Sequence, residues 1–278
     1  MPSPPTGLHA DRQAMPQDRA KVSKATLPRI GKGAHGADTC LVLIPTYNER
    51  ENIDLLLPAI FSLLPDINIM VIDDASPDGT GERVTALSRR YPNLRLHSRK
   101  AKEGLGKAYA DAFRKVLKET DFRSVITMDA DGSHDARYLP ALLSGLAVAD
   151  VVVGSRYTSG GGVANWEKWR RLLSRGGNLY ARLLTGLPIK DLTAGFICMD
   201  REALARITLS DSEASGYAFL IDLKFRLVHQ GGARIAEVPI VFGDRRHGES
   251  KISGHIIAEG LSVPLRLLAR RLATPRRR

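Results

Sequence analysis

The stretch SVITMDADGSHD, residues 124–135, joins a short apolar segment to three aspartates. Two of them, Asp129 and Asp131, are one residue apart and follow closely on the apolar segment. Carboxylates this close repel each other, and both lose hydration beside a protein core. A divalent cation such as Mg²⁺ removes the repulsion, because it binds carboxylate oxygens and keeps positions open for substrate phosphates. Taken alone, however, the motif is more simply explained as a solvated polar turn after a strand.

Strand-like and helix-like segments alternate along the chain on either side of this motif. The helical patterns repeat an apolar residue every three or four positions, whereas the strand-like segments are apolar throughout. Short connections between alternating elements predict an α/β architecture with a mainly parallel central sheet, and apolar strands predict helices on both faces. The expected strands are residues 39–45, 68–73, 94–97, 124–129 and 150–155, and the expected helices are residues 51–64, 81–91, 106–119 and 136–147.

Polar clusters follow three of these strands, namely PTYNE (45–49), DDASPDGT (73–80) and DADGSHD (129–135). In open α/β sheets, ligands bind outside the carboxyl ends of the strands. The three clusters should therefore converge on one crevice. This convergence favours a cation site at Asp129 and Asp131 over a solvated turn.

The positive charge of the chain is concentrated at its two ends. The net charge is +11 over 278 residues, of which residues 1–38 carry +3 and residues 245–278 carry +7. A nucleic-acid-binding domain carries its basic surface on the folded part, which is nearly neutral here, so we expect no nucleic-acid partner. Leucines and six arginines share the segment 261–278, and this mixture favours reversible attachment to an anionic membrane surface.

One proline interrupts this basic segment. We expect Pro264 to begin a helix, because a proline would break a helix that ran through it. Leu265, Leu268 and Leu272 would then share one face, with Leu267 among the arginines, so the helix should be only moderately amphipathic.

The composition predicts three parts: a disordered leader (1–38), one α/β domain (39–255) and a basic membrane-surface tail (256–278). No apolar segment reaches the ~18 residues that span a bilayer, and the first residues lack the apolar core of a signal peptide. We therefore expect a cytoplasmic protein, peripheral on the cytoplasmic face of the membrane. Cys40 and Cys198 are expected to be small buried apolar residues rather than a disulfide or zinc site.

Eight motifs follow one another over about residues 39–255. In order they are PTYNERENI (45–53), VIDDASPDGTG (71–81), GLGKAYADAF (104–113), MDADGSHD (128–135), VVGSRY (152–157), DLTAGF (191–196), GYAFLIDL (216–223) and EVPIVFGDRRHGESK (237–251). This set resembles the family-2 glycosyltransferases that make polyprenyl-phosphate mannose, the dolichol-phosphate mannose synthases. The variant DADGSH, with GGGVANWEKWRRLLSRGGNLY (160–180) after it, is most similar to the actinobacterial polyprenol monophosphomannose synthases.

The resemblance implies a GT-A fold, GDP-mannose as sugar donor, a polyprenyl phosphate as acceptor, and Mg²⁺ or Mn²⁺ as cofactor. It implies that Asp129 and Asp131 hold the metal on the donor diphosphate, with Ser133 as a further candidate ligand. The nucleotide pocket is assigned to Pro45, Tyr47, Glu49, Ile72, Asp74 and Ala130, the phosphate-binding cations to Arg156, Arg245 and Lys251, and the acceptor side to Arg156, Trp166, Arg170, Arg175 and Ser250.

The acceptor in this chemistry is a phosphate monoester, which is already anionic near neutral pH and needs no base. We expect an in-line displacement that inverts the sugar carbon. The metal, held by the two aspartates, and the cations Arg245 and Lys251 would stabilise the departing diphosphate. His134 is adjacent to the metal site, but we expect it to support the turn rather than to act as a base.

Several features leave alternatives open. The segment 166–175, WEKWRRLLSR, is either an interfacial helix on the acceptor side or an ordinary amphipathic surface helix. Ile197 and Leu220 stand where the family often has Arg and Gln, which leaves open a UDP-sugar donor such as UDP-glucose, or a non-catalytic protein that binds a lipid or a partner. Many relatives carry C-terminal transmembrane helices, so this chain would act as a peripheral enzyme or with a membrane-anchoring partner protein.

Overall fold

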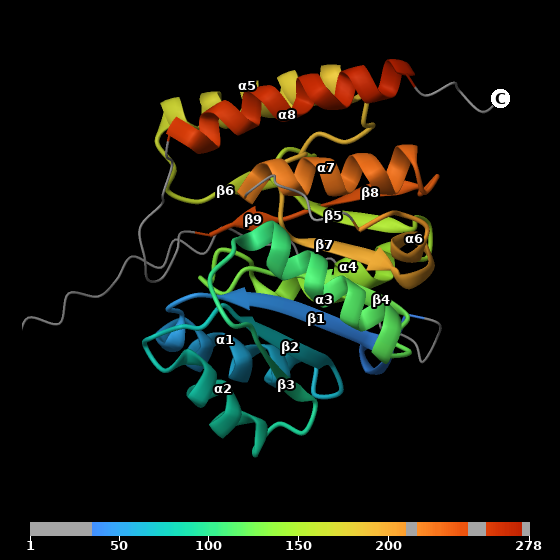
Figure 1. Ribbon diagram of the computed structural model, residues 1–278. Coiled ribbons are helices and arrows are strands. Elements are labelled where there is room, and N and C mark those ends of the chain that lie inside the picture. Colours follow the sequence, from blue (N-terminus) through green and yellow to red (C-terminus); the bar gives the residue numbers. More distant parts are fainter. Residues whose placement is uncertain (1–34, 210–215, 244–253, 274–278) are drawn as a thin grey trace, which may run out of the picture.

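The computed structural model describes residues 35–209, 216–243 and 254–273. A seven-stranded sheet with the order β3-β2-β1-β4-β7-β5-β8 forms its centre (Figure 1). Neighbouring strands are parallel except at β7, which runs antiparallel to both β4 and β5, so the expected mainly parallel α/β sheet is confirmed. The strands are β1 (Cys40–Thr46), β2 (Asn68–Asp73), β3 (Leu94–Ser98), β4 (Ser124–Thr127), β5 (Val151–Ser155), β7 (Ile197–Asp200) and β8 (Ile235–Pro239).

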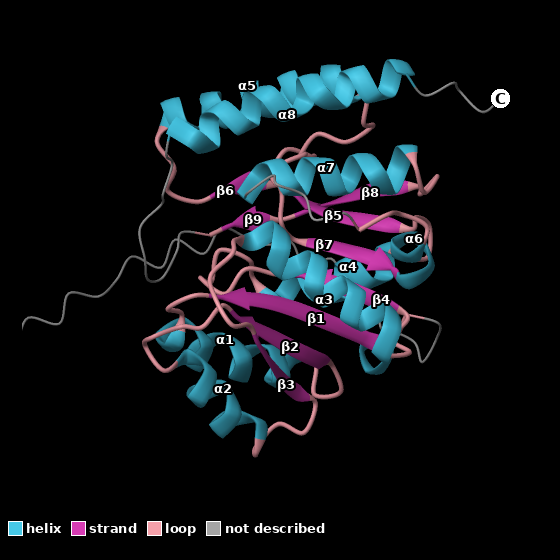
Figure 2. Cartoon of the chain, viewed as in Figure 1, coloured by secondary structure: helices cyan, strands magenta, loops and turns pink. Residues whose placement is uncertain are grey.

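Helices cover both faces of the sheet (Figure 2). The apolar residues of α1, α2 and α4 pack on one face, and those of α3, α6 and α7 pack on the other. The expected helix at 136–147 is shorter than predicted and begins with a 3-10 turn, η2. The bounds are η1 (Ala37–Thr39), α1 (Arg50–Leu63), α2 (Thr80–Ser88), α3 (Leu105–Glu119), η2 (Ala136–Tyr138), α4 (Leu139–Gly145), α6 (Arg201–Ala205) and α7 (Gly216–His229).

The first strand shows how an apolar sequence builds two cores at once. Leu41 and Leu43 belong to the core beneath α3 and α7, whereas Cys40, Val42 and Ile44 belong to the core beneath α1, α2 and α4. Successive side chains of a strand point to opposite faces, so a strand buried on both faces is apolar at every position. Cys40 and Cys198 are both buried free cysteines, as expected.

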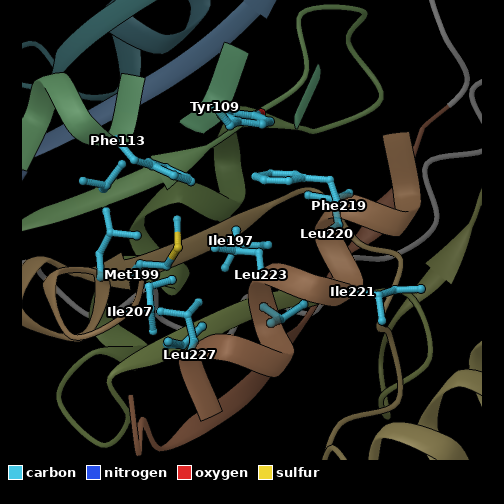
Figure 3. Packing of buried hydrophobic residues seen from close by; sticks show 14 of the residues in the cluster. Tyr109, Phe113, Ile197, Met199, Ile207, Phe219, Leu220, Ile221, Leu223 and Leu227 are labelled. Atoms are coloured by element: carbon cyan, nitrogen blue, oxygen red, sulfur yellow. The ribbon is translucent and has the colours of Figure 1, made fainter. Parts of the chain in front are cut away.

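Aromatic rings fill the core beneath α3 and α7 (Figure 3). Tyr109 stacks on Phe113 with ring centroids 5.8 Å apart and on Phe219 at 6.1 Å. Ile197 and Leu220, the two positions at which the sequence departs from the family pattern, are 0% and 3% exposed in the same core. At both positions the side chain found in this chain is apolar, and it is buried in an apolar core.

A further layer lies beyond α7 and consists of α5 (Lys168–Thr185) and α8 (Gly254–Ala273), which lie side by side (Figure 1). Pro264 lies inside α8, so the prediction that it would break a continuous helix was wrong. Val263 and Leu267, on either side of the proline, are 3% and 2% exposed and pack into the core. We infer that this burial outweighs the hydrogen bond that the proline removes.

The orientation of α8 also differs from the expected one. Leu267, which was placed among the arginines, faces the core, whereas Leu265 and Leu272 are 52% and 78% exposed. The hydroxyl of Tyr180 on α5 donates a hydrogen bond to the carbonyl of Leu261 (2.9 Å), which ties the two helices together. Among the helices that the structure describes, none is long and apolar enough to cross a membrane.

A small second sheet pairs β6 (Gly162–Val163) with β9 (Val241–Phe242). It brings Phe242 close to the turn that follows β4, because the ring of His134 lies 5.5 Å from the ring of Phe242. The backbone N–H of Gly243 donates to the carbonyl of Ser133 (3.0 Å). Gly243, the residue that follows β9, therefore lies beside the turn that contains Asp129 and Asp131.

Candidate active site

The turn after β4 holds Asp129 and Asp131 at the carboxyl end of the sheet. Oδ1 of Asp131 accepts hydrogen bonds from the backbone N–H of Ser133 (3.0 Å) and from its hydroxyl (2.6 Å). Gly132 has a φ of +78°, which glycine adopts without strain. Asp131 is 6% exposed, while the side chain of Asp129 is 35% exposed. The turn thus fixes the carboxylate of Asp131 and leaves that of Asp129 accessible to solvent.

His134 supports this turn from below. Its Nδ1 accepts the backbone N–H of Asp129 (2.9 Å), so the neutral ring carries its proton on Nε2, which lies 3.8 Å from Oδ2 of Asp129. The ring stacks on Phe196 at 4.8 Å and is 2% exposed. Burial lowers the pKa of His134, although the neighbouring aspartates act in the opposite direction. A buried, neutral histidine that is bonded to the backbone is suited to orienting Asp129 rather than to accepting a proton from a substrate.

The residues of this turn fit a hard divalent cation. Two carboxylates and the hydroxyl of Ser133 offer oxygen atoms, the ligands that Mg²⁺ and Mn²⁺ prefer. Across the described ranges, three or more His, Cys, Asp or Glu side chains nowhere gather into a metal-binding group. A cation at Asp129 and Asp131 would therefore complete its coordination with water and with phosphate oxygens of a bound substrate.

The loops after β1 and β2 form one wall, because backbone groups of the first bond to side chains of the second. The N–H groups of Asn48, Glu49 and Arg50 donate to Ser76 Oγ (3.0 Å), Thr80 Oγ1 (3.1 Å) and Asp78 Oδ2 (3.1 Å). Asn48 and Ala75 have φ angles of +60° and +55°. Alanine rarely adopts such a backbone, and strain of this kind is concentrated at functional sites. The first two polar clusters thus meet, as predicted.

Asp73 is the last residue of β2, and its partners differ from those of Asp74, which follows it. Oδ1 of Asp73 accepts hydrogen bonds from Thr46 Oγ1 (3.1 Å) and Ser76 Oγ (2.5 Å), so this side chain holds the loops together. Asp74 forms an ion pair with Arg99 at 2.6 Å, and both side chains are less than one-tenth exposed. Arg99 was not identified from the sequence, because its partner is 25 residues away and no motif contains both.

The other residues assigned to the nucleotide differ in exposure, and two of them, Ile72 and Ala130, do not belong to this wall. Tyr47 is 37% exposed, and Lys102 Nζ lies 3.7 Å from its ring centroid. Glu49 is half-buried and accepts a hydrogen bond from Asn52 Nδ2 (2.6 Å). Pro45 is half-buried, whereas Ile72 is fully buried within β2 and Ala130 is 4% exposed.

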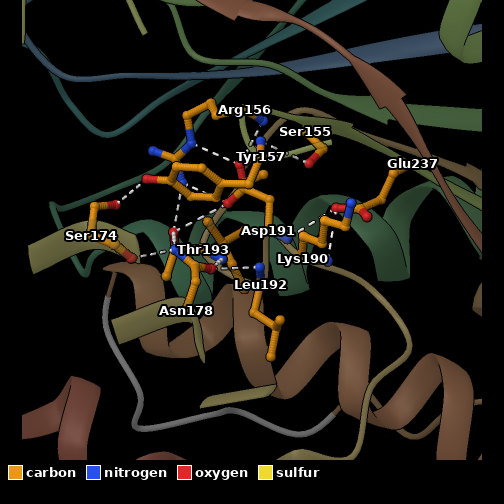
Figure 4. A network of polar contacts seen from close by, with 12 residues as sticks. Ser155, Arg156, Tyr157, Ser174, Asn178, Lys190, Asp191, Leu192, Thr193 and Glu237 are labelled. Carbon is orange, nitrogen blue, oxygen red and sulfur yellow. Dashed lines mark hydrogen bonds and ion pairs between the residues drawn. The ribbon is translucent and has the colours of Figure 1, made fainter. Parts of the chain in front are cut away.

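Arg156 lies at the end of β5 in a buried network (Figure 4). Its Nε and Nη2 donate to the two carboxylate oxygens of Asp191 at 2.7 and 2.6 Å, and its Nη2 also donates to Thr193 Oγ1 (2.6 Å). Burial would raise the pKa of Asp191, but the hydrogen bonds and charge of Arg156 hold it below its usual value. Arg156 was assigned from the sequence to a phosphate. In the structure its guanidinium instead binds the carboxylate of Asp191 in a bidentate manner.

Aromatic rings connect this network to the Asp129 turn. Trp166 lies edge-on to Phe242 at 5.8 Å, and the guanidinium of Arg156 lies 5.7 Å from the Trp166 ring. Arg170 stacks over the same tryptophan at 4.2 Å. Trp166, Arg156 and Arg170, three of the residues assigned to the acceptor side, thus lie together. Arg175 lies 5.9 Å from the ring of Tyr157, one helical turn further along α5.

Lys224 was missed by the sequence analysis. It lies in α7, is fully buried, and its Nζ donates to the carbonyls of Leu192 (2.9 Å), Ala194 (2.6 Å) and Leu220 (3.4 Å). Burial lowers its pKa to about 7, with Asp191 opposing the change. The carbonyls of Leu192 and Ala194 belong to the loop that places Gly195 beside Asp129, since a Cβ on Gly195 would lie 3.7 Å from Asp129 Oδ1. Lys224 therefore braces one side of the site.

Arg245, Ser250 and Lys251 lie outside the described residues, so their predicted roles stay predictions. Gly243, whose N–H bonds to the Ser133 carbonyl, is the last described residue before that segment.

Comparisons with known proteins identify the family of the chain. The model of the family described as glycosyl transferase family 2 matches residues 41–208. The chain is 42% identical over 221 residues to the undecaprenyl-phosphate mannosyltransferase of Micrococcus luteus, covering 80% of this chain and 90% of that protein. It is 45% identical over 225 residues to the polyprenol monophosphomannose synthase of Mycolicibacterium smegmatis, covering 80% of this chain and 83% of that protein.

A solved structure supports the fold at lower similarity. Glucosyl-3-phosphoglycerate synthase from Mycobacterium tuberculosis, in complex with Mn²⁺, UDP and glucosyl-3-phosphoglycerate, superposes with a TM-score of 0.60 at 21% identity. The match covers 90% of this chain and 87% of that structure, which confirms the expected GT-A fold. The family match, the two close relatives and the carboxylate turn at the sheet edge lead to one conclusion: the chain belongs to glycosyl transferase family 2 and is a glycosyltransferase.

Proposed function

We propose that this glycosyltransferase moves mannose from GDP-mannose to a polyprenyl phosphate, with a divalent cation at Asp129 and Asp131. The observation that carries the proposal is the 42–45% identity to two bacterial enzymes named for mannosyl transfer to such lipids, over 80% of the chain. An archaeal dolichol-phosphate mannosyltransferase from Pyrococcus furiosus is 36% identical over 234 residues, and the match covers 63% of that protein.

The donor occupies the crevice between the loops after β1 and β2 and the turn after β4. When bound, the cation neutralises the diphosphate and lowers the barrier to its departure. Asp129 and Asp131 hold it there, and His134 keeps the Asp129 backbone in place through the 2.9 Å hydrogen bond. Arg245 and Lys251 are proposed as fixed cations on the same phosphates, because the chain leading to them starts out from the Ser133 carbonyl.

The transfer itself needs no base. An oxygen of the acceptor phosphate attacks the anomeric carbon of mannose, the bond from that carbon to the diphosphate oxygen breaks, and GDP leaves with the electron pair. The acceptor oxygen is already anionic, so no proton has to be removed. His134 is unsuited to such a role, since it is 2% exposed and its Nδ1 is engaged by the backbone. The mannose carbon is inverted by this single displacement.

The acceptor enters from the side of α5 and α8, which we propose binds the anionic cytoplasmic face of a membrane. The outward side of these helices combines exposed leucines, of which Leu172, Leu183 and Leu272 are 74%, 70% and 78% exposed, with several arginines. Apolar side chains that enter the interface and cations that meet anionic lipid headgroups are the features of a peripheral membrane helix.

Competition binding tests the donor and the metal. A fluorescent GDP analogue is bound to the purified protein with Mg²⁺ and then displaced by unlabelled GDP-mannose or UDP-glucose. We expect displacement by GDP-mannose, at least about tenfold weaker displacement by UDP-glucose, and loss of the bound analogue when EDTA is added. Equal displacement by both nucleotide sugars would overturn the choice of donor, and binding unaffected by EDTA would overturn the metal.

A further inference from the structure

A pocket lies along α5. It encloses about 240 Å³ and is lined by Tyr157, Arg175, Asn178, Leu179, Arg182 and Lys190. None of these residues belongs to the turn that holds Asp129 and Asp131. We propose that this pocket, which shares Arg175 with the acceptor side assigned from the sequence, binds the phosphate group of a ligand.

The charge of the pocket is the main reason. Arg175, Arg182 and Lys190 all line it, and within the part of the chain that the structure describes none of the three forms an ion pair with a carboxylate. The nearest acidic side chains are already engaged. Asp191 holds Arg156, and Oε1 of Glu237 accepts the backbone N–H groups of Lys190 and Asp191, both at 3.0 Å. Cations that line one pocket repel one another, and an anion bound among them would reduce that repulsion.

Internal hydrogen bonds hold the wall of the pocket (Figure 4). Asn178 is 2% exposed, and its Oδ1 accepts the N–H of Leu192 at 2.7 Å while its Nδ2 donates to the Ser174 carbonyl at 2.9 Å. Tyr157 donates its hydroxyl to Ser174 Oγ at 2.6 Å. The polar floor is therefore held by internal hydrogen bonds, and the longer cationic side chains supply the donors that a phosphate needs.

The rim of the pocket indicates which phosphates fit. Leu179 lines it and is 56% exposed, and Leu183, one turn further along α5, is 70% exposed. A phosphate with an apolar substituent would place its charge among the arginines and its substituent along these leucines. A membrane phospholipid and a small free phosphate share the chemistry of the anion and differ in that substituent, so they are the two sources to distinguish.

The test compares two pairs of substitutions on the full chain. Arg182→Gln/Lys190→Gln removes two pocket cations, and Lys168→Gln/Arg171→Gln removes the same charge from exposed positions of α5 that do not line the pocket. Each protein is titrated calorimetrically with inorganic phosphate and, separately, with dihexanoyl phosphatidic acid below its micelle concentration. No nucleotide sugar is present, so the result does not depend on mannosyl transfer.

We expect the pocket pair to weaken binding by about tenfold or more, and the control pair to weaken it by less than about twofold. Binding of both ligands would identify a phosphate site that needs no lipid, whereas binding of phosphatidic acid alone would identify a headgroup site. The proposal is overturned if the unmodified protein binds neither ligand, if the pocket pair binds as tightly as the unmodified protein, or if both pairs lose affinity equally.

Discussion

The surfaces near the two halves of the sheet differ in chemistry. One half contains β1, β2 and β4, and the other contains β5, β7 and β8. On the side of β1, β2 and β4, the loops after the strands carry carboxylates and hydrogen-bonded backbone groups, and the side chain of Asp129 is 35% exposed. On the side of β5, β7 and β8, α5 and α8 form a further layer beyond α7, and their surface is rich in arginine and leucine. The first surface suits a metal-bound diphosphate, and the second suits a lipid with a phosphate head. In the proposed function, the first surface would hold the donor and the second would meet the acceptor.

The largest effect is expected from the buried ion pair at the boundary between the two sides. Asp191→Ala leaves Arg156, which is 6% exposed, without its carboxylate, and should lower the free energy of unfolding by about 3–5 kcal/mol. Urea unfolding followed by circular dichroism measures this loss. Arg156→Met/Asp191→Leu should recover much of the stability, because it removes both charges together. If Asp191→Ala lowered the free energy of unfolding by less than about 1 kcal/mol, the ion pair would not be important for the stability of the fold.

The crevice side is tested at its exposed carboxylate. Asp129→Ala should lower mannosyl transfer by on the order of 10²–10³-fold, which corresponds to about 3–4 kcal/mol of transition-state stabilisation. Its unfolding free energy should change by less than about 1 kcal/mol, because the side chain is partly exposed. As a control, Val148→Ala alters a side chain that is 71% exposed and should leave transfer unchanged. Full activity in Asp129→Ala would remove this carboxylate from the reaction.

The loop between the two sides should respond to pH through Lys224. Its pKa is lowered by burial from 10.5 to about 7, so between these values the unfolded chain binds a proton that the folded chain does not. The free energy of unfolding should therefore rise with pH from about 7 upward, by at most about 1.4 kcal/mol per pH unit. Below pH 7 both states carry the proton, and this contribution to the pH dependence vanishes.

Lys224→Met should flatten that rise, and urea unfolding at pH 7 and pH 9 would measure it. The comparison uses the difference between the two pH values in each protein, so a general destabilisation by the substitution cancels. An equally steep rise in the methionine variant would mean that Lys224 titrates as an exposed lysine does.

The smallest effect is expected at the outer surface of α5. Trp169 and Leu172 are 59% and 74% exposed, and replacing both by Ala should weaken partitioning into anionic liposomes by about 1–2 kcal/mol. Flotation of liposomes that contain phosphatidylglycerol measures the bound fraction, and added salt should reduce it further in every variant. Val148→Ala again serves as an exposed apolar control. Unchanged flotation of the double variant would exclude this face as the membrane contact.

The same division separates what could be predicted from what could not. The crevice is built from short-range patterns: β2 spans the expected residues 68–73, and Asp131 bonds to Ser133 two positions away. The covered side depends on contacts between distant residues, such as Tyr180 with Leu261, which are 81 positions apart. Such pairings leave no local period, so neither the antiparallel β7 nor the burial of Leu267 could be read from the residues.

Lys224 illustrates the limit most clearly. In the sequence it stands in an apolar helical pattern, where a lysine is ordinarily expected on the solvated face. It can be buried because its ammonium group donates hydrogen bonds to three carbonyls, two of which belong to a loop about 30 residues earlier in the chain. Pro264 was misjudged for the related reason that tertiary packing outweighed a local preference.

The most direct test of the central claim is the transfer reaction itself. Purified protein is mixed with Mg²⁺, polyprenyl phosphate in anionic vesicles and GDP-mannose labelled in the sugar, and label is counted in the organic phase. We predict label that is sensitive to mild acid, that depends on the polyprenyl phosphate, and that is absent when labelled UDP-glucose replaces GDP-mannose. No label in the organic phase, from protein that still binds GDP and vesicles, would contradict mannosyl transfer to a lipid phosphate.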